Sequence, residues 1–361
     1  MSKRVLVISN MYPSTEFPHY GIFVKNTNEI IHEAGYEIDG VYIYKTKSTL
    51  KKIMNYLLFF LKTIIKLNFK SYDLIYVHYP ALSAIPLYFW FAKKNTSLFV
   101  NIHGNDLVAE EDKDKKHIKT TLFFLKKASK IIVPSNYFLN ILVNDFSFHE
   151  SKINVYPSGG IDTTLFRPLN THNHKSELDL ESAYKYVGYV SRIEENKGWD
   201  TFLKAGKKFL TLRLDYKLII VGDGNQRKDL DKLVKNLDLE ERIIFLPFQN
   251  HENLVSLLNC LDFFCFPTRR KSESLGLIGL EAMSCGTLVV GSSLYGPSSY
   301  LVDGYNGFSF NPYDVDALFE KMQLIANLDS EKKEELARNA LETAEKFSKK
   351  NTKKNFLSLF D

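Results

Sequence analysis

The sequence predicts an α/β fold built from two Rossmann-like parallel sheets. The chain has 361 residues, a length that suits two domains of ordinary size. Short runs rich in Val, Ile, Leu and Phe alternate with longer helical patterns, which is typical of parallel sheets covered by helices on both faces. This alternation stops near residues 157–168 and then starts again, so the pattern occurs twice along the chain.

The first half of the chain begins with a β-branched run, residues 4–10. A loop containing Pro and Gly follows, and then an amphipathic stretch, residues 22–34, that ends before Gly35. Further short apolar runs are separated mostly by helical stretches. The strands expected in this half are residues 4–10, 36–44, 73–79, 97–103, 130–134 and 153–156.

The boundary between the two domains is predicted in PSGGIDTTLFRP, residues 157–168, where two glycines and two prolines interrupt the pattern. We therefore expect a first domain at residues 1–167 and a second at 168–340. The charged helical segment 341–361 is expected to return to the first domain. The strands expected in the second domain are residues 184–192, 217–224, 242–248, 262–268, 287–293 and 307–312.

Several protein classes are disfavoured by missing signals. The sequence has neither GxGxxG nor GxxxxGK[ST], which disfavours an NAD enzyme and a P-loop nucleotidase. Cys260, Cys265 and Cys285 form no CxxC and no metal-like cluster, so we expect buried thiols in a reducing cytosol. The first apolar run is too short for a signal peptide, and no run of 18 uncharged apolar residues predicts a spanning helix. These features predict a cytoplasmic protein.

The positive charge is concentrated in the first half of the chain. The net charge is +5, and residues 1–165 hold 20 Lys and Arg against 14 Asp and Glu, a balance of +6. The remainder holds 27 against 28, a balance of −1. The basic residues are not interleaved into any motif that reads DNA or RNA, so no nucleic-acid partner is expected.

Two cations lie in one predicted strand-to-helix loop, VSRIEENKGWD. Arg192 ends the strand and Lys197 precedes the helix, so both can converge on an anion such as a diphosphate. The alternative is a solvated loop. The next strand ends in VGDG, where Gly222 and Gly224 either approach a ligand closely or only make a turn.

Two glutamates flank the apolar run in RRKSESLGLIGLEAMSCG. Ser272 or Ser274 is expected to cap a helix that begins near Leu275. Glu273 would then lie above the helix mouth and Glu281 further along the helix, a spacing that fits the two ends of a nucleotide sugar. The alternative is an amphipathic helix with two solvated glutamates.

A single histidine follows a predicted strand in the first half, in NIHGND. His103 at this position is usually a structural hydrogen-bond donor. If the carboxyl ends of the two sheets face each other across a cleft, it becomes a candidate to contact a sugar.

These motifs, in this order, resemble retaining glycosyltransferases of family 4, which have the GT-B fold of two Rossmann-like domains facing across a cleft. The resemblance covers nearly the whole chain: the YP…G loop ending at Gly21, HGND, PSGGIDTTLFRP, SRIEENKG, VGDG, and E-x7-E with EAMSCG. It implies that Gly21 approaches the donor phosphate, that His103 contacts the transferred sugar, and that Arg192 and Lys197 bind the diphosphate. It also implies that Glu273 lies beside the sugar and that Glu281 holds the ribose. The remaining donor-binding residues implied are Gly222, Leu275, Gly276 and Leu277.

The reaction that the resemblance implies is transfer of a hexosyl group from a nucleoside diphosphate, with UDP preferred, and with retention of configuration. The leaving diphosphate would take the acceptor proton, and neither a cofactor nor a metal is expected. The nucleobase would be read by main-chain groups near residues 248–252. Two alternatives remain, a GT-B nucleotide-sugar epimerase and a non-catalytic nucleotide-sugar-binding protein. The first would need acid and base residues flanking the sugar, and the second would be marked by loss of Lys197 or Glu273.

An acceptor is suggested by residues 50–70, LKKIMNYLLFFLKTIIKLNFK. Apolar side chains and lysines together suit a helix lying on an anionic membrane, although the same pattern suits a helix packed on the first sheet. A second basic and aromatic stretch, residues 117–127, points the same way. We therefore expect peripheral contact with the inner face of the cell membrane and a saccharide acceptor that is lipid-linked, as in bacterial lipopolysaccharide or capsule biosynthesis.

Overall fold

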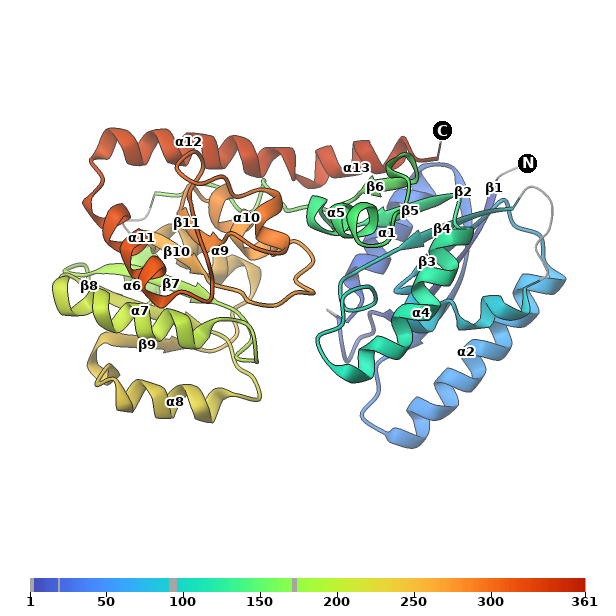
Figure 1. Cartoon of the computed structure of the whole chain (residues 1–361), viewed down its shortest axis with the longest axis horizontal. Helices are drawn as coiled ribbons and strands as arrows, with labels where there is room; N and C mark the ends of the chain where they lie inside the picture. Colours follow the sequence, from blue (N-terminus) through green and yellow to red (C-terminus); the bar gives the residue numbers. More distant parts are fainter. Residues whose placement is uncertain (1–2, 19, 91–95, 171–173, 361) are drawn as a thin grey trace. The chain divides into compact units, whose positions relative to one another are not determined.

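A computed structural model describes residues 3–18, 20–90, 96–170 and 174–360 (Figure 1). The chain forms two compact units, Met1–Gly159 with Thr352–Asp361, and Gly160–Asn351. The division thus lies at Gly159 and Gly160 rather than at residues 167 and 168. The physical reason is that Ile161 forms a parallel bridge with Ser348 and that Phe166, 2% exposed, packs in the core of the second unit.

The first unit contains a six-stranded parallel sheet in the order β2-β1-β3-β4-β5-β6. All six expected strands are confirmed, with ends that differ by a few residues. Their bounds are β1 (Lys3–Tyr12), β2 (Tyr36–Tyr44), β3 (Leu74–His78), β4 (Ser97–Asn101), β5 (Lys130–Val133) and β6 (Ile153–Val155).

Both faces of this sheet are buried, as the apolar runs predict. Along β1, Leu6 and Ile8 pack into one core, whereas Val5 and Val7 pack into the other, because side chains alternate along a strand. The first core is covered mainly by α2 (Thr49–Phe69), α4 (Asp112–Lys127) and α5 (Asn136–Asn144), with the short α3 (Pro80–Ser83) nearby, and the second by α1 (Ile22–Glu33) and α13 (Lys349–Leu357).

The helix α2 is unusual because most of its apolar side chains face outward. Only Phe59, Thr63 and Leu67 are buried. The predicted packing of this helix on the sheet therefore involves only a narrow stripe of side chains. The exposed side chains, called here the α2 apolar surface, are Leu50, Ile53, Met54, Leu57, Leu58, Leu61, Ile65 and Phe69. None of the helices in the described part of the chain has the length and apolar character that crossing a bilayer requires.

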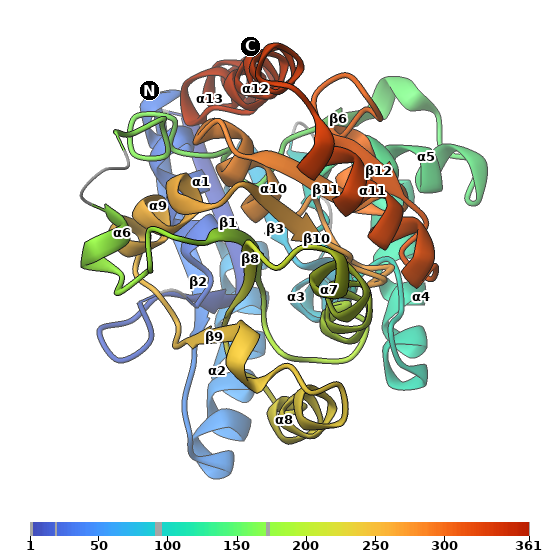
Figure 2. The ribbon, with the colours of Figure 1, turned by 90° about the vertical axis from the view of Figure 1, so that its left-hand side faces the viewer.

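The second unit repeats the arrangement, with a six-stranded parallel sheet in the order β12-β11-β10-β7-β8-β9 (Figure 2). The six strands expected in this half are also confirmed. Their bounds are β7 (Lys185–Val190), β8 (Tyr216–Val221), β9 (Ile243–Leu246), β10 (Phe263–Phe266), β11 (Leu288–Ser292) and β12 (Phe308–Phe310).

Helices cover both faces of the second sheet as well. One core is formed mainly with α7 (Trp199–Leu212), α8 (Arg227–Asn236) and α11 (Val315–Asn327), and the other with α9 (His251–Cys260), α10 (Leu277–Ser284) and α12 (Ser330–Lys346). A short helix, α6 (His174–Glu177), lies near α9. The three cysteines are buried and unpaired by disulfides.

The end of the chain differs from the single segment 341–361 that the sequence predicts. The helix α12 begins already at Ser330 and packs on the second sheet through Ala340 and Ala344. Only residues from Thr352 onward belong to the first unit, to whose core Phe356 and Phe360 contribute.

Strand order reverses once in each sheet. In the first unit the reversal lies between β1 and β3, and in the second between β7 and β10. Loops that leave the carboxyl ends of two such strands diverge to opposite faces, and the space between them is where ligands bind in open parallel sheets.

Candidate functional site

A cavity of about 400 Å³ lies in the second unit at this point of reversal. It is lined by the carboxyl ends of β7, β8 and β10 and by the loop that follows β9. The lining residues are Val190, Ser191, Arg192, Lys197, Val221, Gly222, Asp223, Phe248, Gln249, His251, Leu254, Phe266, Glu273, Gly276, Leu277 and Ile278.

Six of the residues predicted from the sequence line this one cavity. They are Arg192, Lys197, Gly222, Glu273, Gly276 and Leu277. Leu275 does not line it, because its side chain is only 1% exposed and packs in the core beneath. Glu281 does not line it either, since it lies on α10 beyond the first turn. His103 and Gly21 belong to the first unit.

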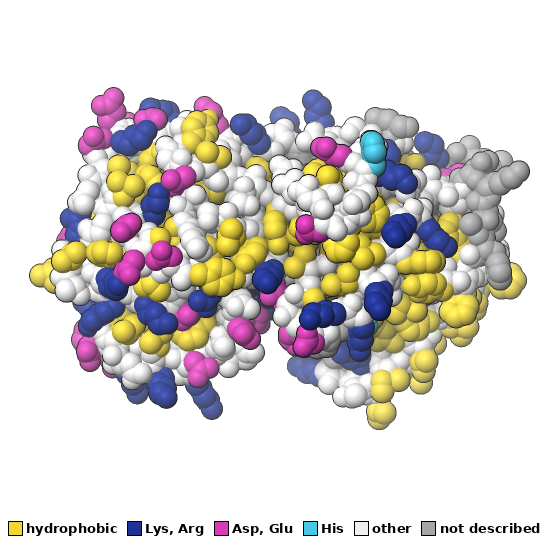
Figure 3. All heavy atoms as spheres, in the orientation of Figure 1, with side chains coloured by type: hydrophobic (Ala, Val, Ile, Leu, Met, Phe, Trp, Pro, Cys, Tyr) yellow, Lys and Arg dark blue, Asp and Glu magenta, His cyan; other side chains and the backbone are white. Residues whose placement is uncertain are grey.

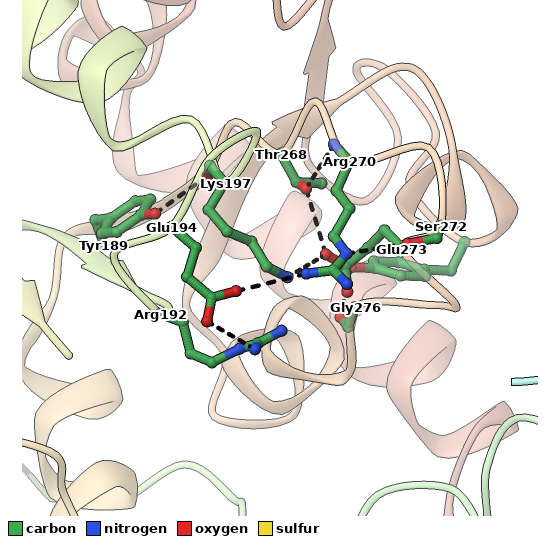
Figure 4. Close-up of polar contacts among 10 residues, drawn as sticks. Tyr189, Arg192, Glu194, Lys197, Thr268, Arg270, Ser272, Glu273 and Gly276 are labelled. Atoms are coloured by element: carbon green, nitrogen blue, oxygen red, sulfur yellow. Dashed lines mark hydrogen bonds and ion pairs between the residues drawn. The ribbon is translucent and has the colours of Figure 1, made fainter. Parts of the chain in front are cut away.

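The central polar contact of the cavity is an ion pair between Lys197 and Glu273 (Figure 4). The Lys197 Nζ lies 2.6 Å from the Glu273 Oε2, and the two side chains are 10% and 13% exposed. Burial by itself would raise the pKa of the Glu273 carboxyl, but the nearby Lys197 and Arg270 charges, and hydrogen bonds from Lys197 and Thr268, lower it below its usual value. Glu273 is therefore a carboxylate at neutral pH.

The loop that presents Lys197 is fixed by its backbone. Asn196 and Gly198 on either side have φ of 62° and 80°, a left-handed conformation that favours glycine. A Cβ on Gly198 would lie 1.9 Å from the carbonyl oxygen of Pro267, so this loop touches the end of β10 directly. The Arg269 N–H donates to the Asn196 carbonyl at 2.7 Å. The loops after β7 and β10 are thus locked together.

Arg192 has a carboxylate partner within its own loop. Its Nη1 donates to the Glu194 Oε1 at 2.8 Å, and the other oxygen of Glu194 lies 3.6 Å from the Arg270 Nη1 (Figure 4). Arg192 and Lys197 therefore line the same cavity, but Arg192 is 60% exposed and held by a carboxylate. The basic run 269–271 was the only sequence signal for Arg270, and spacing along the chain did not connect it to Glu194.

The helix α10 begins later than predicted and without a serine cap. Its N-cap is Gly276, at φ 80° and ψ 61°, and no side chain caps it. The Ser272 hydroxyl instead accepts from the Arg270 Nε at 3.0 Å, so the prediction of a Ser272 or Ser274 cap is wrong. A Cβ on Gly276 would lie 2.3 Å from the Phe266 ring, which explains why glycine stands here. The uncapped amides of the first turn point to an anion-binding role.

A segment after β11 supports this helix start. The Tyr300 hydroxyl donates to the Gly276 carbonyl at 3.0 Å. A Cβ on Gly296 would lie 2.6 Å from the carbonyl oxygen of Glu273, so the segment packs closely under the Glu273 backbone. Sequence reasoning missed both residues, because nothing in the local pattern connects them to α10.

Glu281 lies on α10 and is half-buried. Burial raises the pKa of its carboxyl to about 7, and the Lys349 charge opposes that rise. The neighbouring Cys285 also has its thiol pKa raised to about 12, first by burial and then by the Glu281 charge. The Glu281 carboxyl therefore loses its proton near neutral pH rather than at acidic pH.

In the first unit, His103 lies just beyond the end of β4, in a turn fixed by Asp106. The buried Asp106 carboxylate accepts from the His103 N–H at 3.0 Å and from the Gly104 N–H at 2.7 Å. The His103 Nε2 lies 3.0 Å from the Nδ1 of His78, the last residue of β3. The Phe23 ring packs against the His103 ring, with centroids 4.3 Å apart.

Gly21 lies where α1 begins, with φ 74°. A Cβ there would come within 2.8 Å of the Met11 and Tyr12 backbone, so the helix start is pressed against the end of β1. In the described residues, no group of three or more His, Cys, Asp or Glu side chains is placed to hold a metal ion.

Two family models match successive parts of the chain. Residues 4–165 match the model of Glycosyltransferase Family 4, and residues 170–343 match that of the glycosyl transferases group 1. The D-inositol 3-phosphate glycosyltransferase of Mycobacterium ulcerans (strain Agy99) is 30% identical over 191 residues, 53% of this chain and 41% of that protein. The protein of the same name from Mycolicibacterium smegmatis is 30% identical over 190 residues, 52% of this chain and 43% of that protein. The chain therefore spans about two fifths of the length of these curated relatives.

Solved structures resemble the whole chain. Sucrose-phosphate synthase from Thermosynechococcus elongatus aligns with a TM-score of 0.78 at 20% identity, covering 100% of this chain and 98% of that one. The Anabaena protein HepE, solved with UDP, aligns with a TM-score of 0.78 at 18% identity, covering 99% of both chains. At such identities the likeness shows the fold. The two family models together cover nearly all of the sequence, and the chain therefore belongs to the glycosyltransferases, with a family 4 amino-terminal half and a group 1 carboxy-terminal half.

Proposed function

We propose that this chain transfers a hexosyl group from a nucleoside diphosphate sugar, with UDP as the nucleotide, to a saccharide acceptor with retention of configuration. The observation that carries the proposal is the cavity of about 400 Å³ in which Lys197, Arg192 and the start of α10 meet. Two cations and a helix N-terminus are a site for a diphosphate. The UDP bound to the Anabaena neighbour HepE supports the choice of nucleotide.

The proposed roles follow from the charges of these residues. A diphosphate entering the cavity would be met by Lys197, by Arg192 and by the uncapped amides at Gly276 and Leu277. As the bond to the sugar breaks, negative charge grows on the leaving diphosphate, and groups already fixed in place stabilise that charge most effectively. Glu273 would orient Lys197 and accept a hydrogen bond from the sugar. The proposal assigns no metal and no cofactor.

Two further assignments concern the nucleoside part of the donor. We propose that Glu281 binds the ribose and that the loop holding Phe248, Gln249 and His251 reads the nucleobase, because that loop lines the same cavity. Glu273→Ala would then spare binding of free UDP and reduce transfer, because Glu273 faces the sugar. Glu281→Ala would weaken UDP and the intact donor alike.

We also propose that the acceptor is linked to a lipid and that the first unit rests on an anionic membrane surface. Support comes from the α2 apolar surface, whose side chains gather over that helix (Figure 3). The sequence of α2 contains four lysines and no acidic residue, which suits anionic lipid headgroups. The second stretch, residues 117–127, adds less, since Phe123 is its one large exposed apolar side chain among the described residues.

The proposal is tested by measuring nucleotide binding and sugar transfer together. Isothermal titration with UDP, GDP and ADP is expected to give tight binding for UDP, and Lys197→Met is expected to abolish it. Lys332→Met, which removes a partly exposed lysine of α12, serves as the matched control. Donors that bind but are only epimerised would favour an epimerase, and binding without any turnover would favour a binding protein. No nucleotide binding at all would overturn the donor site.

A further inference from the structure

The contact between His78 and His103 in the first unit restricts where the protons of the two imidazole rings lie. His78 is fully buried, with 0% of its surface exposed, and its Nδ1 faces the Nε2 of His103 at 3.0 Å. Two nitrogens at this distance share one proton, so one ring donates and the other accepts. If His103 donates, its N–H proton is on Nε2; if it accepts, its N–H proton is on Nδ1.

Both rings are neutral at physiological pH. Burial lowers the pKa of His78 well below its usual value, and the nearby His103 lowers it further. Burial also lowers the pKa of His103 to about 3. Each ring therefore carries a single N–H, and only two arrangements of the two protons satisfy the contact.

The two arrangements differ in what they leave unpaired inside the protein. If His103 donated from Nε2, the proton of His78 would lie on its own Nε2. That atom is buried and has no hydrogen-bond partner among the described residues. A buried N–H without an acceptor is costly, whereas an unpaired ring lone pair costs less. The arrangement in which the His78 Nδ1–H donates is therefore favoured.

We propose that His78 is a positioning residue that fixes His103 as the Nδ1–H tautomer. The His103 Nε2 is then occupied as an acceptor, and its Nδ1–H, on the side of the ring away from His78, is the donor offered to a ligand. His103 is half-buried, and the Asp106 carboxylate holds its backbone, so the direction of this donor is fixed by tertiary contacts. Such a donor fits a sugar hydroxyl or ring oxygen as acceptor.

This inference deepens the proposed function, on which the identity of the ligand rests, but the tautomer can be measured without any ligand. Nitrogen-15 labelling of histidine and long-range proton–nitrogen correlation distinguish the two tautomers directly. His103→Gln and His78→Asn identify the two signals among the 9 histidines. The expected result is a protonated Nδ1 and an unprotonated Nε2 for His103. A protonated Nε2 would overturn the proposal.

Two substitutions of His78 by side chains of equal size, Asn and Asp, then separate its hydrogen bond to His103 from its packing in the core. His78→Asn places an amide N–H where Nδ1–H was, so His103 is expected to keep its tautomer and transfer activity. His78→Asp places an acceptor there, which is expected to draw the His103 proton to Nε2 and to slow transfer by about ten- to hundredfold. Binding of free UDP, which the proposed function assigns to the second unit, is expected to stay unchanged in both.

The outcomes remain separable if the aspartate variant does not fold. His78→Leu removes the donor without adding charge, and His103 is then expected to populate both tautomers. If His103 keeps one pure tautomer in His78→Leu, then His78 does not set it and the proposal is wrong. If the tautomer changes as expected while transfer does not, the tautomer inference stands and the proposed sugar contact of His103 is the part that fails.

Discussion

Lys197 and Glu273 form a buried ion pair at 2.6 Å although they stand 76 residues apart in the chain. Each comes from a loop at the carboxyl end of a strand, and the two strands, β7 and β10, are neighbours in the sheet. The pair thus joins the two loops on either side of the point where strand order reverses. Because both residues line the cavity, a substitution in this pair changes both the stability of the second unit and the charge of the cavity.

Removal of the lysine alone should destabilise the fold. Lys197→Met leaves the Glu273 carboxylate buried without its ammonium, and breaking a buried pair in this way costs about 3–5 kcal/mol. Lys332→Met, which breaks a pair with side chains 40% and 49% exposed, should cost less than about 1 kcal/mol. Urea denaturation of both variants measures the difference.

The double variant Lys197→Met with Glu273→Leu extends this test. Because both charges are absent, it should recover most of the stability that the single variant loses. If it were as unstable as the single variant, packing of the lysine stem rather than the unpaired carboxylate would be the cause.

The stability of the protein should depend on pH through Glu281. Its pKa in the folded chain is about 7, above the usual glutamate value of 4.5, so the folded state binds this proton more tightly than the unfolded state. The resulting stabilisation is fully present below pH ~4.5 and is lost as pH rises toward the folded pKa. Glu281→Gln stays neutral, and relative to the parent protein it should gain roughly 2–3 kcal/mol at pH 8 and little at pH 5.

Thermal unfolding across this pH range provides the measurement for Glu281. Glu342→Gln, an exposed position on α12, is the control and should show no such trend. A pH-independent difference between Glu281→Gln and the parent protein would contradict the raised pKa.

Gly198 should tolerate no side chain. Gly198→Ala places a Cβ at 1.9 Å from the Pro267 carbonyl in addition to the strain of φ 80°, so it should cost more than about 3 kcal/mol and weaken UDP binding by displacing Lys197. Gly304→Ala has a similar φ of 73° with nothing within 4 Å and should cost only about 1–2 kcal/mol. Denaturation and calorimetry report the two effects separately. Equal losses of unfolding free energy at Gly198 and Gly304 would show that the positive φ, and not the close approach to Pro267, causes the destabilisation.

The α2 apolar surface should bind anionic bilayers reversibly. Replacing Leu57, Leu61 and Ile65 together by Ser removes side chains that are 46–58% exposed, so liposome flotation should weaken strongly while stability changes little. A matched control replaces Leu212 and Leu214, exposed at 65% and 72% in the second unit, and should leave flotation unchanged.

Lipid composition and salt complete that experiment. Binding of the parent protein should fall with added salt, because lysines near the surface contribute through screened attraction to anionic headgroups. Equal recovery with neutral lipid would count against an electrostatic contribution and against the anionic membrane as partner.

The two sheets were predictable from the sequence alone, since the pattern that indicates each strand is local. A parallel strand buried on both faces is a continuous apolar run, and Val5 to Ile8 of β1 are all fully buried. The sequence also placed Arg192, Lys197 and Glu273 at the ends of such runs. Because carboxyl ends of parallel strands lie at one edge of a sheet, that placement was enough to predict that they share a site.

Which side chains contact each other could not be predicted in this way, because it depends on tertiary packing. The ion pair of Glu194 with Arg270, the contact of His78 with His103, and the hydrogen bond from the Tyr300 hydroxyl to the Gly276 carbonyl all join different loops or strands. The start of α10 was misplaced for the same reason. Serine capping is a local preference, whereas the close approach of the Phe266 ring imposes glycine at the actual cap. Residue spacing along a chain predicts helices and strands, because these have a regular period. The contacts between side chains from distant segments depend on how those segments pack, which local spacing does not show.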